Sequence, residues 1–158
     1  MNDFRKLYEA GQVKRYHTQT TIKDQNLAEH QWGVAMIVNH VYPQGYVLLM
    51  AALTHDLAEC DTGDIPYTAK RDNYNLKSAS DDAEEAFNFQ HNLVQGLNRE
   101  EHKILAWADM FECFLFARRE TWLGNQTMQK VVSTARAALL AMGHPNEKAA
   151  QLFREYHG

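Results

Sequence analysis

An apolar run, residues 46–53, leads directly into a stretch that holds four acidic residues and one histidine, residues 54–64. The apolar run is long enough to form a buried helix, so the core should hold the start of the acidic stretch in place. Carboxylates crowded together repel one another and are costly to bury unless a positive charge shares the site. A divalent metal ion is the usual source of that charge. Glu59 follows His55 by four residues and Asp56 by three, so on a helix it would face the same pocket.

Apolar residues recur at helical spacing through most of the remaining chain. Asn26 and Glu29 form a capping-box pattern at the start of a helix that Pro43 ends. Asn98 and Glu101 repeat the pattern before a long helix that ends near residue 124. The other predicted helices cover residues 4–10, 46–62, 80–97, 127–142 and 146–156. Because no segment alternates as a strand does and the chain has only three prolines, we predict an all-α fold, a helical bundle.

Composition favours a single globular domain over residues 1–158. A hydrophobic content of 45% supports one core of adequate size. The net charge of −4 argues against binding to nucleic acid through phosphate contacts. No signal-peptide pattern is present, and no apolar run approaches the length of a membrane span. Cys60 and Cys113 lie outside any CxxC pattern, so we expect a cytoplasmic protein, in the host cytoplasm if the source is a phage, with no nucleic-acid or membrane partner.

Four side chains form a candidate ligand set for a metal ion. His30 lies in the first turn of a capped helix, and His55 and Asp56 follow the apolar run. Asp109 lies in the middle of the apolar face of the long helix, where a carboxylate is expensive to bury without a partner. Imidazole nitrogens and carboxylate oxygens from three helices suit a divalent first-row metal and leave positions for water and substrate.

Two cations lie in segments predicted to be loops that could cover this site. Arg15 belongs to residues 13–25 and Lys70 to residues 67–79. Either could hold phosphate oxygens, arginine through its planar fork and lysine as a point charge. Polar helix neighbours favour surface positions for the remaining helical histidines, which are His40, His91, His102, His144 and His157.

The order His30, His55-Asp56, Asp109 resembles the H…HD…D pattern of the HD-domain metal-dependent phosphohydrolases. A closer similarity is to the bacterial YfbR-like 5′-deoxynucleotidases and the small phage dATP triphosphohydrolases related to them. It is carried by Val13-Lys14-Arg15-Tyr16, Ala28-Glu29-His30, His55-Asp56-Leu57-Ala58-Glu59, Thr62-Gly63-Asp64-Ile65-Pro66 and Lys70. The most specific part is HDxxE followed by TGDxP. This resemblance implies an HD-domain helical bundle that binds one cobalt, manganese or zinc ion, with magnesium as a further option, through the four candidate ligands.

The resemblance also implies roles for five further residues. Glu59 and Asp64 match the family's acid/base carboxylates, and Arg15 and Lys70 match its phosphate-holding cations. Tyr16 stands where the cellular deoxynucleotidases have tryptophan, which preserves an aromatic wall against the deoxyribose.

The implied activity is hydrolysis of 2′-deoxynucleoside 5′-phosphates at the α-phosphorus. The chain lacks the C-terminal extension of the cellular enzymes, so we expect the compact phage type, a dATP-preferring triphosphohydrolase that releases deoxynucleoside and triphosphate. The first alternative is a 5′-deoxynucleotidase acting on monophosphates. An HD phosphodiesterase, an alarmone hydrolase and a non-catalytic nucleotide sensor are further alternatives. Helix faces rich in phenylalanine and leucine also predict a homo-oligomer.

Overall fold

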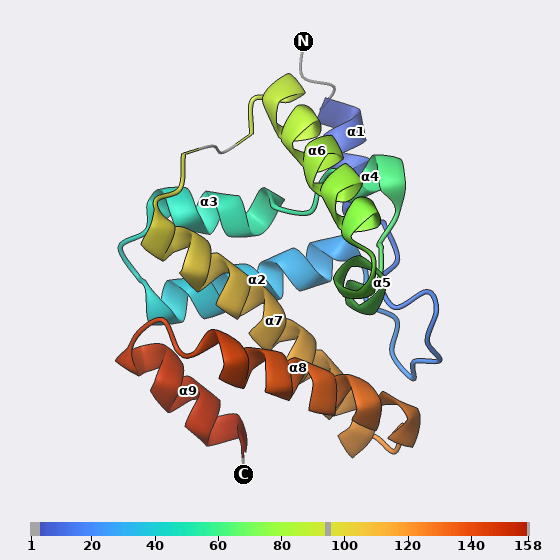
Figure 1. The fold of residues 1–158 in the computed structure, drawn as a ribbon, viewed down its shortest axis with the longest axis vertical. Coiled ribbons are helices and arrows are strands. Elements are labelled where there is room, and N and C mark those ends of the chain that lie inside the picture. Colours follow the sequence, from blue (N-terminus) through green and yellow to red (C-terminus); the bar gives the residue numbers. More distant parts are fainter. Residues whose placement is uncertain (1–3, 94–95, 158) are drawn as a thin grey trace.

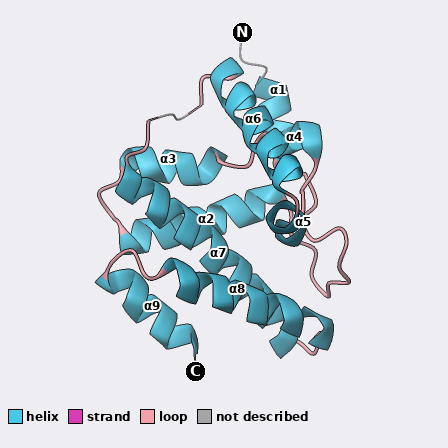
Figure 2. Ribbon diagram, viewed as in Figure 1, coloured by secondary structure: helices cyan, strands magenta, loops and turns pink. Residues whose placement is uncertain are grey.

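The computed structural model describes residues 4–93 and 96–157, and in these residues the chain consists of helices joined by turns and loops (Figure 1 and Figure 2). The β pairing described there is one isolated bridge, between Lys14 and Asn26. The all-α prediction is therefore confirmed. The elements are α1 (Phe4–Ala10), α2 (Leu27–Val41), α3 (Tyr46–Thr54), α4 (Glu59–Thr62), α5 (Tyr67–Asp72), α6 (Tyr74–Gln90), α7 (Arg99–Trp122), the 3-10 helix η1 (Gln126–Met128), α8 (Gln129–Met142) and α9 (Glu147–His157).

Helix α7 is the element around which the other helices pack. It contacts α2 and α3 on one side and α8 on another, and Figure 1 shows it crossing the molecule diagonally between them. Its buried residues Trp107 and Phe111 belong to the main hydrophobic core, together with Val34 and Val38 of α2 and Leu139 of α8. Both predicted capping boxes are present at the starts of α2 and α7. No helix in the described part of the chain has the length and apolar character needed to cross a membrane.

The helix that follows Gly45 is shorter than predicted. Helix α3 ends at Thr54, and His55 and Asp56 lie in a turn before the short α4. The side chain of Thr54 donates a hydrogen bond to the carbonyl of Met50 at 2.9 Å, and Nδ1 of His55 donates to the carbonyl of Ala52 at 2.9 Å. The bond from His55 thus satisfies a carbonyl in the last turn of α3, which a helix leaves unpaired at its end. The metal-ligand candidates are placed by a helix terminus rather than by a helix face.

The loop predicted over residues 67–79 is wrong, because α5 and the first turns of α6 occupy it. The side chain of Asn73 accepts the backbone N–H of Leu76 at 3.1 Å and so begins α6 six residues before the predicted start at Ser80. Helix α6 also ends at Gln90, well before the predicted end at residue 97. Lys70 is therefore held on a helix, and the middle of α6, rather than its start, lies beside the acidic stretch.

The predicted loop over residues 13–25 is confirmed, and it is fastened at both its base and its tip. At the base, Arg15 N–H donates to the carbonyl of Gln25 at 2.9 Å. At the tip, Glu120 of α7, which is 1% exposed, accepts the backbone N–H groups of Ile22 at 2.6 Å and Lys23 at 2.8 Å. Asn125 bonds both Glu120 and the carbonyl of Thr20. These hydrogen bonds hold the irregular segment in place although it has no regular secondary structure.

Replacing Glu120 by alanine should lower the free energy of unfolding by about 2–4 kcal/mol, because two backbone N–H groups lose their acceptor at a buried site. Urea denaturation followed by circular dichroism measures this change. Glu9→Ala is the matched control, since Glu9 forms only an exposed pair with Arg5, and we expect it to change stability by less than about 0.5 kcal/mol. Equal effects of the two substitutions would contradict the anchoring role.

Candidate metal centre

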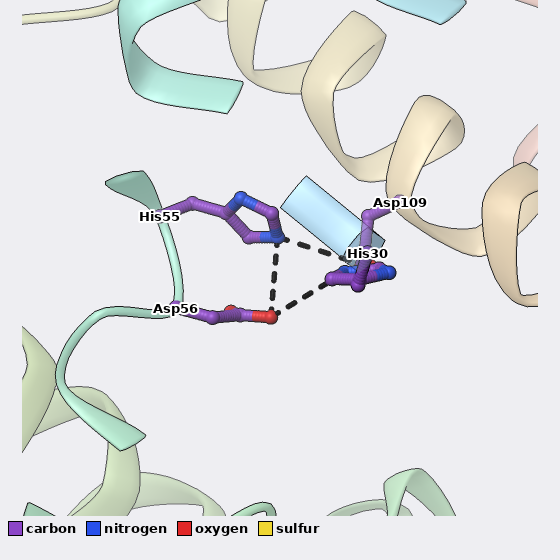
Figure 3. A group of neighbouring side chains, drawn as sticks. All are labelled: His30, His55, Asp56 and Asp109. Atoms are coloured by element: carbon purple, nitrogen blue, oxygen red, sulfur yellow. Dashed lines mark ion pairs between the residues drawn. The ribbon is translucent and has the colours of Figure 1, made fainter. Parts of the chain in front are cut away.

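His30, His55, Asp56 and Asp109 offer ligand atoms that all lie within 4.8 Å of one another (Figure 3). Nε2 of His30 is 3.1 Å from Oδ1 of Asp109 and 3.5 Å from Oδ2 of Asp56. Nε2 of His55 is 3.2 Å from Oδ2 of Asp56 and 3.9 Å from Oδ1 of Asp109. The fold therefore brings together all four residues of the predicted ligand set, from α2, the turn after α3, and α7.

Each imidazole is held so that Nε2 faces the centre of this group. Nδ1 of His55 donates to the carbonyl of Ala52, and Nδ1 of His30 donates to a carboxylate oxygen of Glu112 at 2.5 Å. A proton on Nδ1 leaves a lone pair on Nε2. Both Nε2 atoms are buried and have no hydrogen-bond partner among the described residues. Two nitrogen and two oxygen donors arranged in this way fit a divalent ion such as zinc, cobalt or manganese.

The charges of the group favour a cation at its centre. Burial raises the pKa of Asp56, but the imidazoles of His55 and His30 outweigh it and hold that pKa well below its usual range. Burial also lowers the pKa of His55, yet the carboxylates of Asp56 and Asp109 leave it raised overall. Both shifts come from opposite charges at short distance. A metal ion would supply the same positive charge directly.

The side chain of Asp109 is more exposed to solvent than its apolar neighbours in the sequence predict. Its side chain is 41% exposed, whereas Trp107 and Phe111 on the same helix are buried in the core. The aspartate is therefore less buried than expected: part of its side chain is exposed, while its Oδ1 faces the buried His30. This opening leaves one side of the centre accessible to water or to a ligand.

Arg15 lies beside the four candidate metal ligands, next to the carboxylate of Asp56. Its Nη1 is 3.3 Å from Oδ2 of Asp56, and its side chain is only 11% exposed. Burial lowers the pKa of this guanidinium, but the carboxylates of Asp56 and Asp109 raise it above its usual value. Nε of Arg15 has no hydrogen-bond partner in the described part of the chain. The side chain is thus a fixed cation with donors left for an anion.

Tyr16 is held in a backbone conformation that bulky residues rarely adopt, with φ of 54°. Its N–H donates to Oδ2 of Asp64 at 3.1 Å, and its hydroxyl donates to Sγ of Cys113 at 3.1 Å. Its ring stacks on Phe116 with centroids 4.8 Å apart. The aromatic ring is consequently a rigid wall beside the centre.

Glu59, Asp64 and Lys70 lie around the same site. Burial raises the pKa of Glu59 to about 8, with further contributions from Asp56 and Asp64. Its Oε2 is buried without a hydrogen-bond partner among the described residues. The positive charge of Lys70, on α5, lowers the pKa of Glu59 and also that of Glu84, on α6. Burial and Asp56 outweigh this effect at Glu84, whose pKa is raised overall.

A pocket of about 220 Å³ adjoins the ligand group, and we call it the side pocket. Arg15, Tyr16 and Asp64 line it on the side of the ligands. Its opposite wall comes from η1 and α8. The residues of that wall are Thr127, Lys130, Val131, Thr134 and Ala135.

Sequence reasoning missed three contributors on α7 and one on α6. Glu112, Cys113 and Phe116 follow Asp109 by three, four and seven residues, so their spacing places them near the same helix face. Glu84 was interpreted as an acid at a helix start, because the helix was expected to begin at Ser80. The surface prediction for His91 is wrong, since this residue is buried against Phe87.

Asp56→Ala should abolish tight binding of a divalent ion, because it removes the oxygen that lies close to both imidazoles. Titration of the metal-free protein with Co²⁺, followed by its visible absorption, measures the affinity. Asp72→Ala, which removes an exposed carboxylate paired with Arg71, is the control and should bind as the wild type does. Tight binding by Asp56→Ala would refute the ligand assignment.

Glu59→Gln should stabilise the metal-free protein. The pKa of Glu59 is about 8 in the folded chain and 4.5 ordinarily. Between these pH values the unfolded chain releases the proton that the folded chain retains, so the free energy of unfolding falls as the pH rises. Removing the ionisable group should raise the free energy of unfolding by about 1–3 kcal/mol at pH 8 and by little at pH 5. Denaturation in EDTA at both pH values tests this; an equal effect at both would contradict it.

The sequence matches the family described as 5′-deoxynucleotidase YfbR-like over residues 4–156. No curated protein has a sequence that matches this chain significantly. An HD-domain phosphohydrolase from Listeria innocua has a similar structure, with a TM-score of 0.74, 20% identity and coverage of 96% of this chain and 84% of that one. The cyanophage S-2L HD phosphohydrolase DatZ, bound to dA and one catalytic Zn²⁺ ion, is similar with a TM-score of 0.72, 20% identity and coverage of 99% and 96%.

PH0347 from Pyrococcus horikoshii OT3 is also similar, with a TM-score of 0.65, 21% identity and coverage of 90% of this chain and 99% of that chain. These likenesses share one all-helical architecture, that of the HD-domain phosphohydrolases. The predicted HD-domain bundle is thereby confirmed, and the chain belongs to the 5′-deoxynucleotidase YfbR-like family.

Proposed function

We propose that this protein hydrolyses 2′-deoxynucleoside 5′-phosphates at the bond between the α-phosphorus and the 5′-oxygen. The observation that carries the proposal is the junction between the ligand group and the side pocket. Arg15 contacts Asp56 of the ligand group and also lines the side pocket. A phosphate at the ligand group would therefore have its nucleoside in the side pocket, with one cation serving both.

In this placement the ring of Tyr16 lies against the deoxyribose. The ring is fixed by Phe116 and Cys113, so it can restrict the space around the sugar. The cyanophage DatZ structure holds dA together with a zinc ion, which is consistent with a deoxynucleoside beside the metal. The hydroxyl group of Thr134 on the far wall of the side pocket can bond the edge of a base, adenine among them.

A divalent ion bound by His30, His55, Asp56 and Asp109 supplies Lewis-acid polarisation of a phosphoryl oxygen. The chain's own groups manage the protons and the charge. Glu59, whose pKa burial and neighbouring carboxylates raise to about 8 in the metal-free chain, can hold a proton and give it to the departing 5′-oxygen.

Asp64 is placed to complete the acid/base pair. One of its oxygens accepts the N–H of Tyr16, and the other can take a proton from the attacking water. Arg15 and Lys70 meet the negative charge that develops on the phosphoryl oxygens. The same bond to the 5′-oxygen breaks whether one phosphate or three leave the nucleoside.

Our first candidate substrate is a deoxynucleoside triphosphate, dATP above all. The 41% exposure of Asp109 leaves the outer side of the centre open, which gives room for phosphates beyond the first. The second candidate is a deoxynucleoside monophosphate, favoured by the family of 5′-deoxynucleotidases to which the chain belongs. Large exposed apolar side chains, among them Trp32 and Trp122, also support the prediction of self-association.

Chromatography of reaction products tests the proposal. Purified protein with Co²⁺, Mn²⁺ or Zn²⁺ is given deoxy- and ribonucleoside mono- and triphosphates, with Asp56→Ala as the inactive control. We expect deoxynucleoside plus triphosphate, fastest from dATP and at least about tenfold slower from ATP. Nucleoside released only from monophosphates would establish the 5′-deoxynucleotidase instead. Absence of hydrolysis from every nucleotide would overturn the proposed function.

A further inference from the structure

We propose that Glu112 is the positioning residue for His30, and that Gln25 and Gly33 hold Glu112 in place. The inference concerns how tightly the site binds a metal ion, so it rests on the metal-dependent function proposed above. It assigns a function to a buried acid, a buried amide and a glycine that lie outside the ligand group. Gln25 and Gly33 both lie against Glu112, at a point where α2, α7 and the end of the 13–25 loop meet.

The first step is the bond between Glu112 and His30. Oε2 of Glu112 accepts from Nδ1 of His30 at 2.5 Å, and both residues are buried. A carboxylate accepts, so a proton lies on Nδ1, and Nε2, which faces Asp109 and Asp56, is the nitrogen left for a metal ion. The acceptor for His30 is a charged carboxylate, whereas the acceptor for His55 is a neutral carbonyl. The charged acceptor makes His30 the stronger metal ligand of the two.

The second step explains why a glutamate is required at this position. Nε2 of Gln25 donates to the other oxygen, Oε1 of Glu112, at 2.7 Å. Donors therefore approach both ends of the same carboxylate. A glutamine at residue 112 could accept from His30 only with its amide N–H groups facing Gln25, whose own amide would then have to turn, and it would carry no negative charge. The carboxylate accepts from both residues and also brings the charge that strengthens His30 as a ligand.

The third step is steric. A Cβ on Gly33 would lie 2.9 Å from Cγ of Glu112 and 3.3 Å from its Oε1. Such an approach is closer than side chains tolerate, so α2 must lack a side chain here for Glu112 to reach His30, which lies three residues earlier on the same helix. The side chain of Glu112 therefore occupies the space that a Cβ on Gly33 would take.

Gln25 also joins this unit to the substrate side of the site. Its carbonyl accepts the N–H of Arg15, while its side chain holds Glu112. The segment that carries the phosphate-holding cation and the carboxylate that orients His30 therefore share one residue.

The test measures metal affinity in Glu112→Gln and Gly33→Ala by Co²⁺ titration, beside thermal unfolding in EDTA. We expect both variants to bind Co²⁺ about 10–100-fold more weakly, as loss of a group that supports a ligating histidine does in other metal sites. Gly33→Ala is the sharper variant because it leaves every polar group in place and changes only the position of Glu112. Where Glu112→Gln does not fold, Gln25→Ala takes its place, with an expected weakening of about threefold or more.

Glu120→Gln is the matched control, since it changes another buried glutamate of α7 that bonds loop N–H groups and no metal ligand. It should bind Co²⁺ as the wild type does. Wild-type affinity in Gly33→Ala, or lower thermal stability with unchanged affinity, would overturn the inference. A wild-type protein that binds Co²⁺ and hydrolyses no nucleotide would overturn only the proposed function, whereas one that binds no divalent ion would overturn both.

Discussion

One face of α7 supports every part of the site. Asp109 faces the metal ligands, Glu112 orients His30, Phe116 stacks on Tyr16 and Glu120 holds the tip of the 13–25 loop. These residues recur at intervals of three or four, so they follow one line along the helix. Because α7 is also the centre of the hydrophobic core, the position of that line is set by packing that is far stronger than any single polar contact. Core packing thereby gives the site its precision.

The same site carries a cost to stability. Glu59 is buried among carboxylates that raise its pKa, and Tyr16 adopts a left-handed backbone conformation. Neither feature helps the chain to fold, and both lie where a reacting phosphate would be bound. Groups kept in unfavourable surroundings at such places are usual in enzymes. The buried glutamate bonds at residues 112 and 120 offset part of this cost, since each satisfies two donors at once.

Local patterns predicted what local interactions determine. Two capping boxes and apolar spacing placed α2 and α7 correctly, and the acidic stretch pointed to the metal ligands. The end of α3 was missed because the bonds from Thr54 and His55 to helix carbonyls arise only once the turn has formed. The start of α6 was missed because a single Asn73 competes with a more obvious acidic cap. Glu112 was missed for another reason: its partner His30 is 82 residues away in the chain, and its spacing of three residues from Asp109 indicates a shared helix face but not that partner.

The walls of the side pocket come from different parts of the chain. Arg15, Tyr16 and Asp64, in loops beside the candidate metal ligands, line one side, whereas the opposite wall comes from η1 and α8. Neither of those elements contributes a residue to the ligand group. Under the proposed function, substitutions in η1 and α8 would change the shape of the base-binding side without touching a candidate metal ligand. Proteins of this architecture could then diverge in the ligands they accept while their metal sites stay the same.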